Sequence, residues 1–297
     1  MRRIRLHWYQ TRNFGDALCP KLVGYLSGCD VVHAHPRSAD IMGVGSVLFS
    51  GSAVFVEKRR LASSYGIGKM LLKCLDAFQP LLHIWGSGFL YDPGVLDAFQ
   101  IRKVRLCATR GQKTLDAFVR AGVVSKEASA NVILGDPGLL YPMMLNERPM
   151  KEFDIGVVSH FRDAVAGRKF CDALKKSGVK VKLIDVMQDN PLNVVREIAS
   201  CEKILSSSLH GLVVADALQI PNRHVVFSLL GQKKDDFLFK FEDYYSAFGE
   251  GEEDIIDGNS VVSPVEILKM VPDSPRFAHD RILERLDALK ASFPFRQ

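Results

Sequence analysis

The chain has 297 residues, of which 47% are hydrophobic and 25% are charged, and its formal net charge is +5. This length exceeds the usual size of one hydrophobic core, so we expect two domains of roughly 150 residues each in an ordinary globular protein. The basic residues are spread along the chain and form no tail or stripe, which argues against nucleic acid as a partner.

Targeting and metal-binding signals are absent from the sequence. Met1-Arg2-Arg3 leads directly into an alternating strand pattern, without the apolar stretch of a secretory signal, so we expect a cytoplasmic protein. No apolar run reaches the ~18 residues of a membrane span. The six cysteines lack Cys-x-x-Cys spacing and His33 and His35 form the only close histidine pair, so we expect buried thiols and no metal. The mild positive charge suits anionic small substrates and the headgroups of an inner leaflet equally well.

Short apolar runs bounded by glycine alternate with longer helical patterns, which is typical of parallel β/α units. The first half predicts a Rossmann-like sheet. Its expected strands are Ile4–Trp8, Asp30–His33, Ile41–Val44, His83–Gly86, Val104–Ala108 and Val132–Leu134. Its expected helices are Ala17–Leu26, Arg59–Leu75 and Gln112–Ala121.

The segment Tyr141–Lys151 contains two prolines and no periodicity, so we place a domain boundary there, between residues 1–145 and 152–297. A second α/β series follows, and Ser263–Ala291 is a helical stretch that could pack back across the first domain. The expected strands are Asp154–Ser159, Val179–Asp185, Lys203–Ser206 and His224–Phe227, and the expected helices are Phe170–Ser177, Pro191–Ala199 and Gly211–Ala217. Ligands of such sheets bind at the carboxyl ends of the strands, here along a cleft between two facing domains.

The first candidate loop, residues 11–16 (TRNFGD), joins the first strand to the first helix. Asn13 and Asp16 can cap this helix, Gly15 permits a tight turn, and the free amides of the first turn would face the cleft. Asp16 is also placed to accept a hydrogen bond from a sugar hydroxyl. An ordinary capped turn would use the same residues, so that interpretation stays open.

Four further loops of the first half end at the same edge. Paired glycines at 43/45 and 86/88 would let a ligand approach the backbone, although a G-x-G without a third glycine is weak evidence for a dinucleotide. Arg110 precedes a helix, where its charge opposes the helix dipole unless an anion lies nearby. Asp136, in the turn 135–138 (GDPG), could orient Arg110. An exposed arginine is the alternative.

The second half contributes the strongest signal, residues 206–211 (SSSLHG), between a strand and a helix. Its hydroxyls and helix-start amides can bind phosphate, and His210 can exchange a proton near neutral pH. Three successive serines at a buried strand end also need partners, which a ligand phosphate would provide. His160 and Arg162, two residues apart on an extended backbone, could face the same anion, or lie in a surface turn. Lys240, which follows the charged segment 231–236, could be a further cation for the donor.

In order, the motifs N-F-G-D, G-S-G, R-G, G-D-P, S-S-L-H-G and K-F-x-D-Y-Y, between about Ile4 and Gly249, resemble those of the polysaccharide pyruvyltransferase family, and most of all its bacterial exopolysaccharide branch. This resemblance implies a glycosyltransferase-B-like pair of Rossmann domains, the first for the acceptor and the second for the donor. It implies phosphoenolpyruvate as donor, a pyruvate ketal across two sugar hydroxyls as product, His210 as the catalytic residue, and no cofactor. Some relatives carry a donor-binding arginine where this chain has Ser208, so Arg110, Arg162 and Lys240 become the candidates for that charge.

The resulting site hypothesis divides into three groups. We assign catalysis to His210 and Asp16. The donor-binding candidates are Arg110, His160, Arg162, Ser207, Ser208, Leu209, Gly211 and Lys240. The acceptor-binding candidates are Asn13, Phe14, Gly15, Gly86 and Ser87.

Two other functions remain open on the sequence. A nucleotide-sugar-dependent glycosyltransferase of the same fold would also hold a diphosphate at a helix N-terminus. A non-catalytic glycan-binding protein with a vestigial site is the second, suggested by Ser208. The acceptor is a sugar, either a soluble nucleotide sugar or a lipid-linked oligosaccharide at the inner leaflet. The latter would explain the slight basic bias and would imply peripheral association with the inner membrane.

Overall fold

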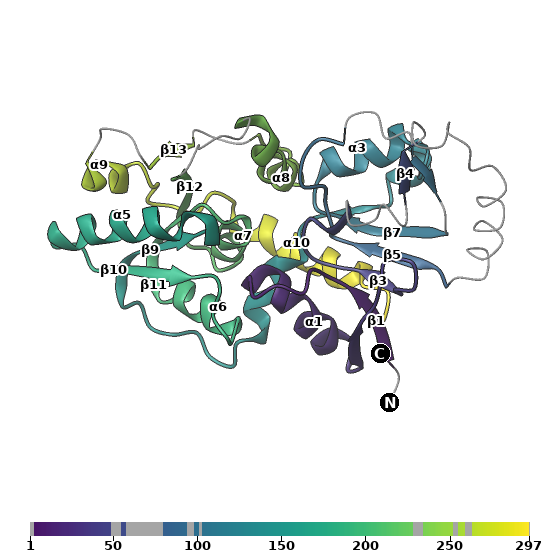
Figure 1. The fold of residues 1–297 in the computed structure, drawn as a ribbon, viewed down its shortest axis with the longest axis horizontal. Helices are drawn as coiled ribbons and strands as arrows, with labels where there is room; N and C mark the ends of the chain where they lie inside the picture. Colours follow the sequence, from purple (N-terminus) through teal and green to yellow (C-terminus); the bar gives the residue numbers. More distant parts are fainter. Residues whose placement is uncertain are drawn as a thin grey trace.

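The computed structural model of the chain describes residues 3–48, 55–57, 80–93, 98–100, 103–227, 234–251, 255–258 and 263–296. Two parallel β-sheets surrounded by helices make up most of this structure, which confirms the predicted α/β fold with two Rossmann-like domains (Figure 1). A small antiparallel pair, β4 (Phe55–Glu57) with β6 (Ala98–Gln100), was not predicted. The expected helix Arg59–Leu75 lies outside the described residues.

The first sheet has six strands in the order β2-β1-β3-β5-β7-β8, and every neighbouring pair is parallel. Because β1 lies between β2 and β3, the order of strands reverses there, and loops leave the sheet on both sides. Such a switch point is where ligands of open α/β sheets bind. The strands are β1 (Arg3–His7), β2 (Asp30–His33), β3 (Ile41–Met42), β5 (Leu82–Trp85), β7 (Val104–Thr109) and β8 (Ile133–Leu134).

The second sheet repeats this arrangement with five parallel strands in the order β10-β9-β11-β12-β13. Its switch point lies at β9, between β10 and β11. The change of sheet falls between β8 and β9, an interval that contains the segment in which we placed the boundary. The strands are β9 (Phe153–Ser159), β10 (Val181–Asp185), β11 (Cys201–Ser206), β12 (Asn222–Val226) and β13 (Ile256–Asp257), the last of which was not predicted.

Local capping explains where the helix α1 begins. The Asn13 side chain accepts a hydrogen bond from the Gly15 amide at 3.2 Å, so the helix starts at Phe14, three residues before the predicted start. Gly28 ends it with φ of 63°, in the left-handed region that favours glycine. The helices are α1 (Phe14–Ser27), α3 (Gln112–Arg120), α4 (Lys126–Ser129), α5 (Ala164–Lys176), α6 (Leu192–Ala199), α7 (Leu209–Ala217), α8 (Lys234–Ser246), α9 (Pro264–Lys269) and α10 (His279–Ser292), with 3-10 helices η3 (Pro137–Met144) and η4 (Phe161–Asp163).

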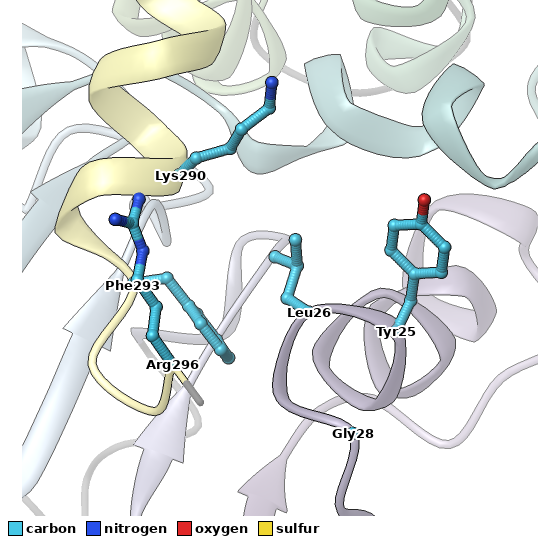
Figure 2. Close-up of a pocket in the computed structure, with 6 residues that line it drawn as sticks. All are labelled: Tyr25, Leu26, Gly28, Lys290, Phe293 and Arg296. Carbon is cyan, nitrogen blue, oxygen red and sulfur yellow. The ribbon is translucent and has the colours of Figure 1, made fainter.

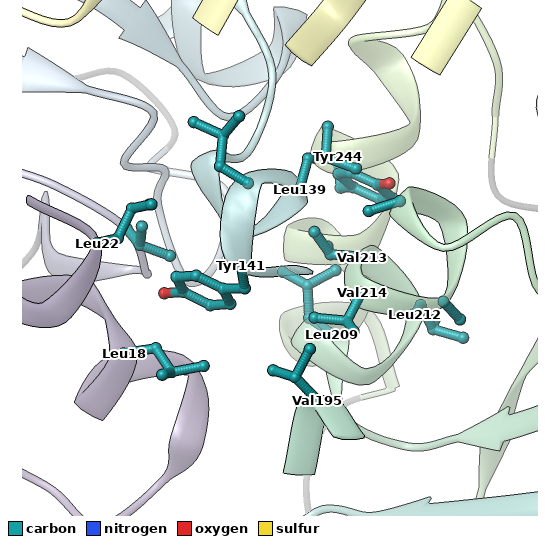
Figure 3. Close-up of a cluster of buried hydrophobic side chains, with 14 of the residues drawn as sticks. Leu18, Leu22, Leu139, Tyr141, Val195, Leu209, Leu212, Val213, Val214 and Tyr244 are labelled. Carbon is teal, nitrogen blue, oxygen red and sulfur yellow. The ribbon is translucent and has the colours of Figure 1, made fainter. Parts of the chain in front are cut away.

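One hydrophobic core runs from the first domain into the second (Figure 3). Tyr141 of η3 lies between Leu18 of α1 and the apolar side chains of α6 and α7, such as Val195 and Leu209. The Tyr141 hydroxyl is buried there and donates a hydrogen bond to the Gly15 carbonyl at 2.6 Å. The domains are therefore packed against each other through η3, which fixes how their loops meet.

The last part of the chain returns to the first domain. The helical stretch predicted over Ser263–Ala291 is two helices, α9 and α10, separated by a segment with two prolines. Helix α10 packs against β7, β8 and η3, and the Trp85 indole N–H donates to the Leu289 carbonyl at 3.1 Å. The ring of Phe293 lies edge-on to Trp85, with centroids 4.9 Å apart. The C-terminal helix thus completes the core of the first domain.

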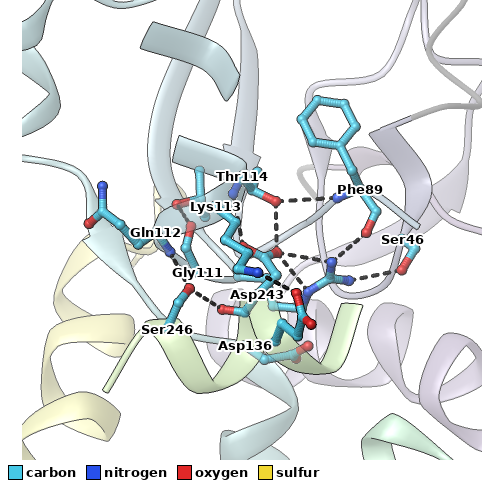
Figure 4. A network of polar contacts seen from close by, with 12 residues as sticks. Ser46, Phe89, Gly111, Gln112, Lys113, Thr114, Asp136, Asp243 and Ser246 are labelled. Atoms are coloured by element: carbon cyan, nitrogen blue, oxygen red, sulfur yellow. Dashed lines mark hydrogen bonds and ion pairs between the residues drawn. The ribbon is translucent and has the colours of Figure 1, made fainter. Parts of the chain in front are cut away.

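Helix α8 follows β12 of the second sheet but packs on α3, and a buried ion pair holds it there (Figure 4). Arg110 and Asp243 are both fully buried, with Nε and Oδ2 3.0 Å apart. The Asp243 carboxylate also accepts hydrogen bonds from the Thr114 amide and hydroxyl, at 2.8 and 2.7 Å. Arg110 donates in addition to Ser46 at 2.8 Å and to the Phe89 carbonyl. Every part of this guanidinium therefore contacts the protein itself.

We expect Asp243→Asn to lower the free energy of unfolding by about 3–5 kcal/mol, because it leaves the Arg110 charge buried without a counter-ion. Glu242→Gln is the matched control on the same helix. Glu242 pairs with Lys113 of α3, but these side chains are 37% and 44% exposed, so the loss should be about 0–1 kcal/mol. Urea unfolding measures both; equal losses would show that the buried pair does not hold α8.

Candidate functional site

The two switch points bring predicted site residues from both domains together. Asp16 lies in the first turn of α1, directly after β1, and its Oδ1 lies 3.0 Å from where a Cβ atom on Gly45, after β3, would stand. From the second domain, His160 follows β9 and His210 follows β11. The carboxyl ends of the strands thus supply the site, as the parallel topology requires.

The imidazole of His210 is inserted between loops of the first domain. His210 is 9% exposed, and a Cβ atom on Gly15 would overlap its Nδ1 atom. Its Cδ2 atom lies 3.2 Å from the corresponding position on Gly138. The rings of Phe14 and Tyr141 lie 6.2 and 6.3 Å away, centroid to centroid. The ring therefore lies where the domains meet, against glycine backbone on two sides.

Asp136 faces His210, a relation that the sequence analysis missed. Its Oδ2 lies 3.7 Å from His210 Nε2, while its Oδ1 accepts a hydrogen bond from the Gly138 amide at 2.8 Å. We had expected Asp136 to orient Arg110, but the carboxylate on Arg110 is Asp243. The G-D-P motif marked Asp136 as a polar residue at a strand end; the identity of its partner depends on packing between the domains.

Asp16 is a carboxyl group in unusual surroundings. Burial raises its pKa, while His210, a hydrogen bond of 3.1 Å from the Thr11 hydroxyl and the charge of Lys240 act in the opposite direction. A carboxyl group of this kind can accept or release a proton closer to neutral pH than an exposed one. Its place in the first turn of α1 also satisfies the helix dipole.

Lys240 brings a positive charge to this region from α8. Burial, with a smaller contribution from Arg110, lowers the pKa of the Lys240 ammonium group to about 8, although Asp16 and Asp163 act in the opposite direction. The Nζ atom lies 5.0 Å from the centre of the Phe241 ring. A cation in this position is partly desolvated, which strengthens its attraction for an anion.

His160 and Arg162 do not share an extended backbone, which was the reason for expecting their side chains to point the same way. Strand β9 ends at Ser159, and His160 is the cap of η4, its Nδ1 accepting from the Arg162 amide at 3.4 Å. Burial lowers the pKa of His160 to about 4, and nearby Lys240 contributes, so the ring is neutral at pH 7. Arg162 is exposed beside the Phe161 ring, 5.7 Å from its centre.

The serine run is largely satisfied inside the protein, which corrects our argument that a ligand must supply its partners. Ser206 Oγ donates to the Ser208 carbonyl at 2.8 Å, and Ser207 Oγ accepts from the His160 amide at 2.9 Å. Ser208 precedes α7 without a side-chain capping bond. A Cβ atom on Gly211 would overlap Ser206 Oγ, and Leu209 belongs to the core. Packing alone therefore accounts for the glycine at position 211 and the leucine at position 209.

The acceptor candidates make close contacts within the protein itself. The Phe14 amide donates to the Val186 carbonyl of the second domain at 2.9 Å. Gly86 has φ of 78°, and a Cβ atom there would overlap the ring of Pro137. The buried Ser87 hydroxyl donates to the Gly43 carbonyl. Direct contact of these residues with an acceptor stays a prediction.

A separate groove of about 430 Å³ lies at the other end of α1 (Figure 2). This helix has 14 residues and is therefore about 20 Å long, so the groove is remote from His210. It is lined by Tyr25, Leu26, Gly28, Lys290, Phe293 and Arg296. None of these is a predicted site residue.

Within the described ranges, no three His, Cys, Asp or Glu side chains are grouped so that they could hold a metal ion. Of the helices in those ranges, none combines the length and the apolar character needed to cross a membrane. Cys19, Cys171 and Cys201 are buried, Cys29 and Cys107 are partly buried, and Cys74 lies outside the described residues.

No protein-family model matches the chain. Over 168 residues it is 32% identical to the uncharacterized protein L143 of Acanthamoeba polyphaga mimivirus. The match covers 56% of this chain and 54% of that protein, so the chain spans about half the length of the relative it matches. The name of that protein states no activity, and function therefore has to be argued from the site.

We expect Gly15→Ala to displace the His210 imidazole and to lower the free energy of unfolding by about 1–3 kcal/mol, because the new methyl group overlaps Nδ1. Gly24→Ala in the same helix is the control. Its methyl group would lie 3.7 Å from the nearest atoms, so it should leave stability unchanged or raise it by about 0.5–1 kcal/mol. Thermal unfolding and a crystal structure of each variant measure the two effects; an unmoved ring in Gly15→Ala would contradict the close contact.

Proposed function

We propose that the chain is a pyruvyltransferase that transfers the pyruvyl unit of phosphoenolpyruvate to a sugar of an exopolysaccharide or its lipid-linked precursor, forming a ketal. One observation carries the proposal: His210 and Asp16, from different domains, meet beside Lys240 where the carboxyl ends of both sheets converge. The ordered motifs that resemble the polysaccharide pyruvyltransferase family lie at the same positions. Proton transfer, a carboxyl group and a cation are what this reaction needs.

The donor carries a carboxylate and a phosphate, and the region around Lys240 is suited to such an anion. Arg110 and Arg162 both lower the pKa of Lys240, while Asp16 and Asp163 raise it, so cationic side chains lie near one another in this region. Because Arg110 is engaged by Asp243, Ser46 and Phe89, direct contact with the donor falls first on Lys240 and Arg162. The neutral His160 adds a hydrogen-bonding group and no charge.

The reaction starts with transfer of a proton from the imidazolium of His210 to the methylene carbon of the enol phosphate. The electron pair of the double bond forms the new C–H bond, and the adjacent carbon becomes cationic. A sugar hydroxyl adds to this carbon, phosphate leaves with its bridging oxygen, and a second hydroxyl adds to close the ketal. Of the two hydroxyl protons released, one restores the imidazolium and the other leaves on the phosphate. Asp16 is placed to take the proton of the attacking hydroxyl and to pass it to the leaving phosphate.

A nucleotide-sugar glycosyltransferase is the competing function, and binding measurements separate the two. Calorimetry with phosphoenolpyruvate should give a saturable signal, and UDP- and GDP-sugars should give none.

Phosphate release that depends on an added glycan acceptor would exclude a vestigial, glycan-binding protein. Mass spectrometry of the surface glycan with and without the gene should show loss of a pyruvate substituent. Binding of a nucleotide sugar alone would overturn the proposal.

We expect His210→Ala to lower turnover of phosphoenolpyruvate by at least ~100-fold, because general acid catalysis contributes an effect of this size. The circular dichroism spectrum should remain that of the wild type. His224→Ala is a suitable comparison, since that histidine stacks on Phe241, with centroids 3.8 Å apart, and is not a site residue. Wild-type turnover in His210→Ala would remove this residue from the mechanism.

We expect kcat/KM for phosphoenolpyruvate to fall as the pH rises through about 8, because Lys240 loses its positive charge there. Lys240→Arg should abolish this alkaline decline, since a guanidinium stays charged to beyond pH ~12. Lys113→Arg, on the exposed face of α3, should leave the profile unchanged. A decline that persists in Lys240→Arg would show that another group binds the donor.

A further inference from the structure

Two buried polar atoms face each other at the centre of the site. His210 Nε2 and Asp136 Oδ2 are each shielded from solvent, and neither makes a hydrogen bond with any described residue. They lie 3.7 Å apart, which is longer than a hydrogen bond. Buried polar groups without hydrogen-bond partners are rare and costly. The closest available partner of His210 Nε2 is Asp136 Oδ2, and the two atoms are chemically complementary.

We propose that Asp136 is the positioning residue of His210: its Oδ2 accepts a hydrogen bond from Nε2–H, so that the ring exchanges protons with substrate through Nδ1. The inference deepens the proposed function, on which its kinetic consequence rests, whereas the arrangement of the two side chains stands on the geometry alone. The hydrogen bonds of catalytic residues are often long before substrate binds and shorten in the complex.

Asp136 is held firmly enough to define the direction of the ring. It is fully buried at the end of β8, where its Oδ1 accepts from the Gly138 amide and caps η3. The next residue, Pro137, packs tightly against Gly86. Since η3 itself packs between α1 and α7, the carboxylate is fixed relative to both domains. Tyr141 cannot replace it, because that hydroxyl is engaged by the Gly15 carbonyl.

The Nδ1 atom of His210 faces the loop 11–16, which contains predicted acceptor-binding residues. Nε2 is shielded, so the 11% of the side chain that remains exposed belongs to other atoms. Nδ1 lies against the backbone of Gly15, beside Asp16 in the first turn of α1. With Nε2–H donated to a carboxylate, a neutral ring has its lone pair on Nδ1, and a charged ring has its transferable proton there. The substrate must then approach from this side.

The protons balance without a change in the state of Asp136. Nδ1–H gives its proton to the methylene carbon and recovers the lone pair, and Nε2–H stays where it is. Asp136 remains ionised throughout and stabilises the positive charge of the imidazolium, as a buried carboxylate does beside a catalytic histidine. Asp136 acts through His210 and needs no contact with substrate.

The variant Asp136→Asn tests this arrangement on the free protein. Its Oδ1 can still accept from the Gly138 amide, which directs the Nδ2 donor toward His210. Two donors cannot face each other, so the proton of the neutral ring should move from Nε2 to Nδ1. Nitrogen-15 NMR of the imidazole reports this tautomer, and the His210→Gln spectrum identifies its signals among the eight histidines. We expect Nε2–H in the wild type and Nδ1–H in Asp136→Asn.

The kinetic test uses the same variant with phosphoenolpyruvate and acceptor. We expect kcat to fall about 10²- to 10⁴-fold, because the proton lies on the wrong nitrogen, with KM for phosphoenolpyruvate within about threefold of the wild type. Asp185→Asn is the matched control, because Asp185 makes the same type of turn at the end of β10, accepting from the Met187 amide at 2.9 Å, and it is exposed. This variant should change neither tautomer nor kcat.

The outcomes separate the two proposals. An unchanged tautomer in Asp136→Asn, or Nδ1–H in the wild type, overturns the role of Asp136. A loss of kcat with no change of tautomer overturns it as well, because that pattern indicates general damage. A switched tautomer in a protein that does not turn over phosphoenolpyruvate supports the positioning role and rejects the pyruvyltransferase.

Discussion

The close contact between the His210 ring and the backbone of Gly15 is the constraint on which the site depends. It joins a helix start in one domain to a helix start in the other, and it exists because η3 packs between α1 and α7. The hydrophobic core that crosses the boundary keeps these elements in register. Because packing already holds the His210 ring in place, one hydrogen-bond acceptor is enough to orient it, and Asp136 faces Nε2 for that role.

Burial acts on the charged groups in two different ways. Arg110 and Asp243 are buried as a pair with several further hydrogen bonds, so their charges are compensated and serve the attachment of α8 to α3. The charges of Lys240 and Asp16 are compensated less completely, and burial shifts the pKa of each toward neutrality. Lys240 and Asp243 belong to the same helix, so the ion pair between Asp243 and Arg110 also positions Lys240.

The sequence predicted the elements better than the contacts between them. Hydrophobic patterns located β2 at its observed bounds and the other strands of both sheets except the short β13, because strand periodicity is a local property. The direction of Arg162 could not be predicted, since it depends on η4 ending the extended backbone after Ser159. The pairing of Arg110 with Asp243 joins residues 133 positions apart, which no local pattern encodes. Such contacts between distant segments decide which polar residues are left for a ligand.

The route of the chain has a consequence for synthesis. Trp85 is covered by α10 and Arg110 is neutralised by α8, so the first domain is completed by segments that are synthesised 204 and 133 residues later. Although domains often fold in turn as they emerge, this one has an uncovered indole and an uncompensated guanidinium until α8 and α10 have been synthesised. Completion of the first domain therefore waits for synthesis of the second, and a nascent chain that stalls before residue 279 leaves the Trp85 indole uncovered.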